Sequence, residues 1–154
     1  MPTRDDNSAE TLSDREFANS RVFDAPPERV FKAWTDPNHL GQWWGPKGFT
    51  NTFEEFDIRP GGHWRFVMHG PDGTNHKNHS IFVEVVEPER IVFNHISGPK
   101  FQVTAACAEQ AGKTELTFRM LFESVAECER IKVFAFEVNE QNFDRLAAQL
   151  ERMG

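Results

Sequence analysis

The last third of the sequence constrains the fold most, because neither Gly nor Pro occurs between Lys113 and Met153. Residues 114–122 (TELTFRMLF) alternate apolar and polar side chains, which is the pattern of a strand with one buried face. Residues 124–127 (SVAE) then match a capping box, a signal that begins helices. We therefore predict a strand followed by one long helix, from about Val125 to Met153.

Two neighbouring apolar stripes run along this predicted helix, and amides interrupt both near the middle. The first contains Ile131, Ala135, Val138, Asn142, Leu146 and Gln149, and the second contains Phe136, Asn139, Phe143, Leu146 and Leu150. Stripes of this kind predict that another layer covers the helix. A buried amide needs a hydrogen-bond partner, and a bound ligand is one such partner.

The first third of the chain predicts one strand and two short helices. Residues 16–24 (EFANSRVFD) have the character of a strand. A proline-led helix start follows at Pro26, and Pro37 ends that helix. A second short helix begins at Pro37 and is closed by Gly45 and Pro46.

Turn signals divide the middle of the chain, from Phe49 to Phe122, into consecutive strands with short connections. They are Pro60-Gly61-Gly62, Gly70-Pro71-Asp72-Gly73, Pro88-Glu89, Gly98-Pro99 and Ala111-Gly112. Short connections imply antiparallel neighbours. We predict an α+β fold in which a curved antiparallel sheet of about six to seven strands surrounds the C-terminal helix. A single helix does not easily fill such a sheet, so the arrangement favours a cavity.

Composition argues against several classes of protein. The net charge is −7 and no cluster of Lys and Arg stands out, so we expect no nucleic-acid partner. No run approaches the roughly 18 apolar residues of a membrane span, and the polar start lacks a signal-peptide pattern. We expect a cytoplasmic protein without membrane insertion, with reduced thiols at Cys107 and Cys128. Residues 1–14 are expected to form a disordered tail, and residues 15–154 a single domain.

Titratable residues give little support to catalysis or metal binding. Four of the six histidines fall between residues 63 and 79, but without the spacing of a metal motif. Candidate acid–base groups are Glu55, Asp57, His63, Arg65 and His95. No nucleophile motif accompanies them, and sequence spacing does not show that two of them converge. We therefore predict no metal, no cofactor and no catalytic residue, and we favour binding over enzymatic activity.

Several motifs occur in the order typical of one known family. They are RVFDAPPERVFKAWTDPNHLGQWWGPKGF (21–49), IRPGGHWRFVMHGPDG (58–73), VVEPERIVF (85–93) and FDRLAAQL (143–150). The sequence resembles the AHSA-type branch (activator of heat-shock-protein ATPase homologues) of the START/Bet v 1-like SRPBCC superfamily. The resemblance implies a helix-grip fold with an internal apolar cavity, and association into a homodimer. Family members often carry Gly-Trp where this chain has Val138 and Asn139, which predicts a pocket of different shape and polarity.

The predicted binding site is the cavity between the sheet and the long helix. Trp43 lies three residues after Leu40 and is expected to anchor the core, whereas Trp44 points about 100° away, toward a cavity entrance. Asn139 and Asn142 are expected to supply polar groups to a mainly apolar lining. The predicted ligand-binding residues are Trp44, Trp64, Phe66, Met68, Phe118, Met120, Phe136, Asn139, Asn142 and Phe143.

The function predicted from these residues is binding of a small apolar or amphipathic molecule. Two alternatives follow from the resemblance: a co-chaperone-like activator of a heat-shock-protein ATPase, and an enzyme similar to a polyketide cyclase or lyase. A third interpretation is structural, since protein interiors normally pack densely and the same aromatic residues would then fill the core.

Overall fold

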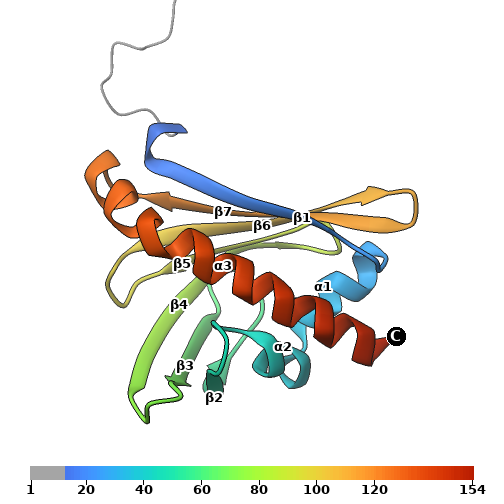
Figure 1. The fold of residues 1–154 in the computed structure, drawn as a ribbon, viewed down its shortest axis with the longest axis horizontal. Helices are drawn as coiled ribbons and strands as arrows, with labels where there is room; N and C mark the ends of the chain where they lie inside the picture. The colour runs from blue at the N-terminus through green and yellow to red at the C-terminus, as the bar shows by residue number, and fades with distance from the viewer. Residues whose placement is uncertain (1–12) are drawn as a thin grey trace, which may run out of the picture.

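The structure, a computed structural model, describes residues 13–154 and consists of one sheet with a long helix lying across it (Figure 1). In chain order the elements are η1 (Ser13–Arg15), β1 (Glu16–Phe23), α1 (Pro27–Thr35), α2 (Pro37–Trp43), β2 (Thr50–Phe56), β3 (His63–His69), β4 (Asn75–Val86), β5 (Arg90–His95), β6 (Phe101–Gln110), β7 (Lys113–Phe122) and α3 (Val125–Met153). Within the described residues, no helix is both long and apolar enough to cross a membrane.

The sheet has seven strands in the order β1-β7-β6-β5-β4-β3-β2, and every neighbouring pair is antiparallel. The strands β2 to β4 bend away from β1, β7 and β6, so the sheet is strongly curved (Figure 1). Among the strands, α3 approaches β1 and β7 most closely, and α1 and α2 lie beside its C-terminal half. This arrangement confirms the predicted helix-grip fold with two short helices after the first strand.

The predicted bounds of the long helix are also confirmed. The Ser124 hydroxyl accepts the backbone N–H of Glu127 at 3.1 Å, which caps α3 as the capping pattern predicts. The Glu127 carboxylate pairs with Arg130 at 2.9 Å on the surface. The predicted disordered tail, residues 1–14, lies outside the described residues except for its last two, which belong to η1.

Trp43 is a core anchor, as its position in the sequence predicted. Its side chain is 1% exposed, and its indole N–H donates to the carbonyl of Ala33 at 2.9 Å. The ring also meets Trp34 edge to face, with 4.9 Å between centroids. These contacts join α2 to α1, because the indole belongs to one helix and both partners belong to the other. An aromatic pair of this kind stabilises a fold by about 0.5–1.5 kcal/mol beyond its area burial.

Candidate functional site

A cavity of about 270 Å³ lies between the sheet and α3. Strands β3 to β7 form one wall, α3 forms the other, and residues 44–46 and Pro99 complete the lining. The lining is mainly apolar, as in most small-molecule sites. The described side chains leave this volume between the sheet and α3 unfilled.

The sheet wall follows from the alternation of side chains along its strands. Trp64, Phe66 and Met68 point inward from β3, and Phe118 and Met120 point inward from β7. All five were predicted to line the cavity, and the structure brings them together there.

The same wall contains a short polar row that the sequence did not reveal. Trp64 on β3 is paired with Ser80 on β4, and Ser80 is paired with His95 on β5. The indole N–H of Trp64 and the hydroxyl of Ser80 are buried without a hydrogen-bond partner. Buried polar groups are usually paired, so these two atoms are exceptions, and neither has accessible surface that a ligand could reach.

His95 is the titratable side chain of this wall. Its Nδ1 donates to the carbonyl of Pro99 at 2.9 Å, and its Nε2 lies 2.9 Å from Asn78 Oδ1, whose amide nitrogen donates to the carbonyl of His76. Burial lowers the pKa of His95 from its ordinary value, and the hydrogen bond to Pro99 opposes that shift only in part. Burial and the two oxygens that face its ring nitrogens therefore act on this imidazole in opposite directions.

The helix wall is formed by one face of α3. It contains Ile131, Phe134, Ala135, Val138, Asn139 and Asn142. Asn139 and Asn142 are 6% and 7% exposed, so both amides are inside the molecule, as predicted.

Phe136 and Phe143, in contrast, do not line the cavity, which corrects their predicted placement. Phe136 is 44% exposed and its ring lies 6.5 Å from that of Phe17 on β1. Phe143 packs edge to face against Phe23 on β1, with 5.5 Å between centroids, and the Arg21 guanidinium lies over its ring. Each residue follows a lining residue by one position, and a step of about 100° turns it toward β1.

Trp44 forms part of the cavity wall where α2 ends. Its backbone N–H closes α2 by donating to Leu40, and its ring lies 5.4 Å from Trp34 and 5.2 Å from Trp64. The two adjacent tryptophans thus have different positions: Trp43 packs into the core, and Trp44 lines the cavity. Glycine is required next, because Gly45 has a φ of +104° and a Cβ there would come 2.6 Å from the Met68 methyl group.

Helix α3 holds the loop that carries Trp44 through one arginine. The Arg145 guanidinium donates to the carbonyls of Gln42, Trp44, Gly45, Pro46 and Phe49, at 2.9–3.3 Å. Burial, and to a smaller extent the neighbouring Arg152, lowers the pKa of Arg145, which nevertheless stays charged. We define residues 42–49, which are the last two residues of α2 and its connection to β2, as the α2–β2 loop.

Two amides of α3 add to this attachment. Asn142 Oδ1 accepts the N–H of Gly45 at 3.0 Å, and Gln141 Oε1 accepts the N–H of Lys47 at 3.1 Å. The loop at the edge of the cavity is therefore fixed to α3 by three polar side chains from one stretch of the helix, Gln141, Asn142 and Arg145.

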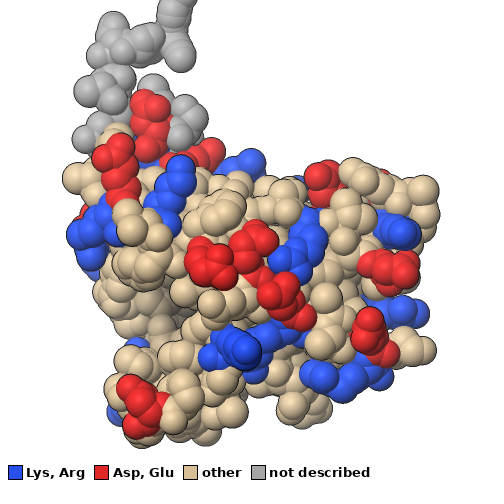
Figure 2. Space-filling model, viewed as in Figure 1, with Lys and Arg blue, Asp and Glu red and all other residues tan. Residues whose placement is uncertain are grey.

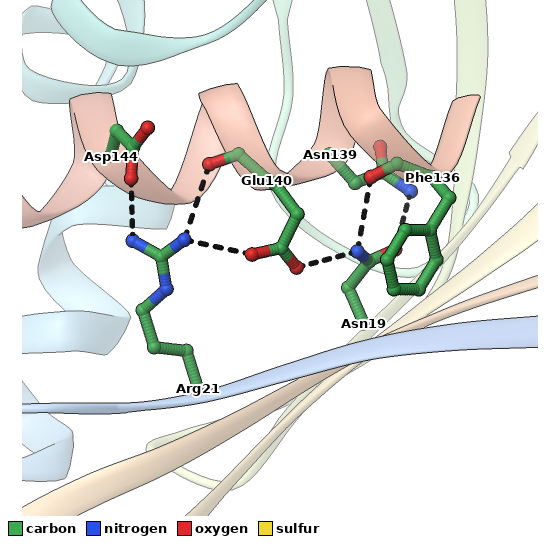
Figure 3. A network of polar contacts seen from close by, with 6 residues as sticks. All are labelled: Asn19, Arg21, Phe136, Asn139, Glu140 and Asp144. Carbon is green, nitrogen blue, oxygen red and sulfur yellow. Dashed lines mark hydrogen bonds and ion pairs between the residues drawn. The ribbon is translucent and has the colours of Figure 1, made fainter. Parts of the chain in front are cut away.

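A second polar network connects α3 to β1 (Figure 3). Arg21 pairs with Glu140 at 2.9 Å and with Asp144 at 2.8 Å. The other oxygen of Glu140 accepts from Asn19 Nδ2 at 2.7 Å, and Asn19 Oδ1 accepts from Asn139 Nδ2 at 3.1 Å. The network therefore leads from the surface to an amide in the cavity wall.

Most of the candidate acid–base groups lie away from the cavity. Glu55 pairs with Arg65 at 2.9 Å, and Asp57 pairs with Arg59 at 2.8 Å. His63 contacts His79, with 2.8 Å between ring nitrogens, and neither lines the cavity. Of the five candidates only His95 does so. Among residues 13–154, no group of three or more His, Cys, Asp or Glu side chains is placed to hold a metal ion.

The molecular face that carries α3 has mixed charge. Figure 2 shows Lys and Arg interspersed with Asp and Glu across this face, without a continuous basic patch. Near the N-terminal half of α3, Val133 is 84% exposed and Phe134, which also lines the cavity, is 57% exposed. The cavity therefore opens beside an apolar part of the helix.

The chain belongs to the family described as Activator of Hsp90 ATPase homolog 1-like protein (AHSA1), whose profile matches residues 24–151. The family lies in the SRPBCC/Bet v 1-like superfamily, so the resemblance seen in the sequence is confirmed. Among curated proteins, no sequence matches the chain significantly.

Solved structures share the fold over almost the whole chain. Protein NE0264 from Nitrosomonas europaea has a TM-score of 0.84 and 18% identity, covering 92% of this chain and 97% of its own. A protein from Arthrobacter aurescens has a TM-score of 0.84 and 23% identity, covering 94% and 92%. The AHSA1 protein from Silicibacter pomeroyi has a TM-score of 0.74 and 23% identity, covering 90% and 99%. At these identities, the likeness concerns the fold alone.

Proposed function

We propose that the protein binds a small apolar or amphipathic molecule in the cavity between α3 and the sheet. The observation that supports this most is the open volume of about 270 Å³, which large apolar side chains surround but do not fill. Protein interiors usually contain few voids larger than a water molecule. Small-molecule sites occupy roughly 300–1,000 Å³, so this cavity lies slightly below that range and is suited to a small ligand.

Apolar burial would supply most of the binding free energy. A ligand with the area of one aromatic side chain, roughly 150–250 Å², gains about 4–6 kcal/mol at about 25 cal/mol per Å². Lost translational freedom opposes this gain. Simple probes are therefore expected to bind in the micromolar to millimolar range, whereas a natural ligand with matched polar groups binds more tightly.

Binding is better supported than catalysis by the same lining. General acid–base chemistry needs groups that converge on one substrate atom, and His95 is the single acid–base candidate in the cavity among the described residues. A cytoplasmic setting and association into a homodimer, both expected from the sequence, belong to the same proposal.

The test uses N-phenyl-1-naphthylamine, a neutral probe whose fluorescence rises in apolar surroundings. Val138 lines the cavity and Val133, on the same helix, is 84% exposed and does not. The same substitution at the two positions, Val138→Phe and Val133→Phe, therefore separates cavity filling from a general change in α3. We expect a saturable rise with the unaltered protein and with Val133→Phe, and a loss of at least tenfold in affinity with Val138→Phe.

Equal binding by all three proteins would place the probe outside the cavity and refute the proposal, as would the absence of saturable binding to the unaltered protein. Circular dichroism and the thermal midpoint show whether each variant is folded. A melting shift with the probe gives a second, independent measure of binding.

A further inference from the structure

The α3 wall of the cavity contains one hydrogen-bond acceptor with a fixed orientation. Asn19 Nδ2 donates to the carboxylate of Glu140 and to the carbonyl of Phe136, at 2.7 and 3.1 Å, and both partners can only accept. The other end of the Asn19 amide, Oδ1, must then accept from Asn139 Nδ2. The network in Figure 3 thus fixes the Asn139 amide, with Oδ1 as the atom that has no partner among the described residues.

The same wall contains one donor, whose orientation is fixed by a different contact. The backbone N–H of Gly45 can only donate, so the atom of Asn142 that faces it is Oδ1. Asn142 Nδ2 is then a donor, and within residues 13–154 it has no hydrogen-bond partner.

Both atoms keep some accessible surface, and both residues line the cavity. Asn139 and Asn142 line it from positions three residues apart, and residues with this spacing are neighbours on one helix face. Neither Asn139 Oδ1 nor Asn142 Nδ2 is among the unpartnered atoms that lack accessible surface, unlike the indole N–H of Trp64 and the hydroxyl of Ser80. An acceptor and a donor therefore lie about one helical turn apart on an otherwise apolar surface.

The described lining of the cavity has no side chain with a permanent charge, and burial lowers the pKa of its titratable side chain, His95. No Lys, Arg, Asp or Glu is among the described residues that line it. Glu140, whose carboxylate holds Asn19, is itself paired with Arg21. Burial of an ionised group without an opposite charge is strongly unfavourable.

From these contacts we infer that the cavity selects neutral, mainly apolar ligands that present a hydrogen-bond donor and acceptor side by side, as cyclic amides (lactams) do. The lactam carbonyl accepts from Asn142 Nδ2, and its N–H donates to Asn139 Oδ1. The inference rests on the proposed function and specifies the class of ligand. It excludes fatty-acid anions and other carboxylates as preferred ligands, although they are also amphipathic.

Displacement of N-phenyl-1-naphthylamine by four bicyclic compounds of similar size tests the inference in the unaltered protein. They are 2-quinolinone, which has both polar groups; 1-methyl-2-quinolinone, which lacks the donor; naphthalene, which lacks both; and 2-naphthoate, which is an anion at pH 7. Two additional hydrogen bonds are expected to give 2-quinolinone about a tenfold advantage over naphthalene. The N-methyl compound should fall between them, and 2-naphthoate should bind most weakly.

Two matched variants test the role of Asn142. Asn142→Asp keeps an oxygen for Gly45 N–H but replaces the free donor with an acceptor, so 2-quinolinone should lose about tenfold in affinity while naphthalene changes less than about twofold. Gln141→Glu makes the same chemical change at the preceding residue, which also accepts from a backbone N–H but does not line the cavity. It should change neither affinity by more than about twofold.

The outcomes separate this inference from the proposed function. If the probe does not bind at all, the proposed function fails and the inference fails with it. If the probe binds but naphthalene or 2-naphthoate displaces it as well as 2-quinolinone does, the cavity binds ligands and the inference is wrong. Because the comparison of the four compounds needs no substitution, it decides the question even if Asn142→Asp does not fold.

Discussion

Arg145 should contribute more to stability than an ordinary surface arginine, because its guanidinium joins α3 to the α2–β2 loop. Replacement by methionine, Arg145→Met, keeps most of the side-chain length and removes every donor. Four of the five carbonyl contacts are 3.0 Å or shorter, and the fifth, to Trp44, is 3.3 Å. The substitution therefore removes a donor from five backbone carbonyls, of which Trp44 and Pro46 keep another donor, Asn51 Nδ2 and the N–H of Phe49.

The expected loss follows from these four short contacts. At about 1.5 kcal/mol for each bond to a charged donor, they sum to about 6 kcal/mol. Two effects reduce this figure: the freed carbonyls lie in a loop that water can reach, and the buried guanidinium no longer has to be desolvated. We expect a net loss of about 3 kcal/mol, which corresponds to a fall in the melting midpoint of roughly 6–12 °C for a domain of this size.

Urea denaturation followed by circular dichroism measures this loss. The control is Arg130→Met on the same helix, where Arg130 is exposed and pairs with Glu127 at 2.9 Å. Exposed ion pairs contribute little, so the control should leave the midpoint almost unchanged. If Arg145→Met and Arg130→Met shift the midpoint equally, Arg145 does not hold the loop and the argument is refuted.

Three further predictions concern individual side chains. Trp43→Phe should cost about 2–3 kcal/mol of unfolding free energy in urea, because it removes the hydrogen bond to Ala33 and leaves a cavity, while Trp44→Phe should cost clearly less and should instead weaken probe binding. Burial lowers the pKa of His95 below its ordinary 6.5, so the folded state disfavours protonation. The free energy of unfolding should therefore be highest above about pH 6.5 and fall at lower pH, and the fall should be smaller in His95→Gln. Thermal midpoints between pH 5 and 8 measure both effects. Burial raises the pKa of the Cys107 thiol to about 12 and also raises that of Cys128, so iodoacetamide at pH 8 should label both only after denaturation; rapid labelling of the native protein would contradict this burial.

Much of the fold was accessible from the sequence because its signals are local. Alternation in residues 114–122 and the cap at Ser124 depend on neighbours in the chain, and both agree with β7 and with the start of α3. The antiparallel order follows from short connections alone. Trp64, Phe66 and Phe118 could be assigned to the cavity for the same reason, since every second residue of a β-strand points to the same face of the sheet.

The face of α3 that lines the cavity could not be predicted, because it depends on the rotation of the helix about its own axis, which no local sequence signal determines. The two apolar stripes of the helix are both real. The first lines the cavity, whereas Phe136 and Phe143 of the second face β1, and Asn139 of the second lines the cavity and also bonds to Asn19 on β1. The sequence gives no reason to choose between them, because both are apolar and both are interrupted by an amide. The choice is made by contacts distant in sequence, such as Arg21 with Glu140.

Partners across long separations were also inaccessible to pattern arguments. In the sequence, Arg145 is simply a charged residue of a helix. Its role in holding the α2–β2 loop becomes visible only in the structure, because the carbonyls that it binds lie about a hundred positions earlier in the chain. Ser80 was missed for a similar reason: its hydroxyl matters because the strand register places it between Trp64 and His95. The lining residues Ile131, Ala135 and Val138 were visible as a stripe, but the cavity could not be assigned to it.

Side-chain NMR of the ¹⁵N-labelled protein during titration with 2-quinolinone tests the central claim most directly. The four tryptophans provide an internal comparison, since Trp44 and Trp64 line the cavity and Trp34 and Trp43 do not. We expect the largest shifts at the indole N–H of Trp44 and Trp64 and at the amide of Asn142, with little change at Trp43. Shifts confined to surface amides, or equal shifts at all four indoles, would contradict a ligand site between α3 and the sheet.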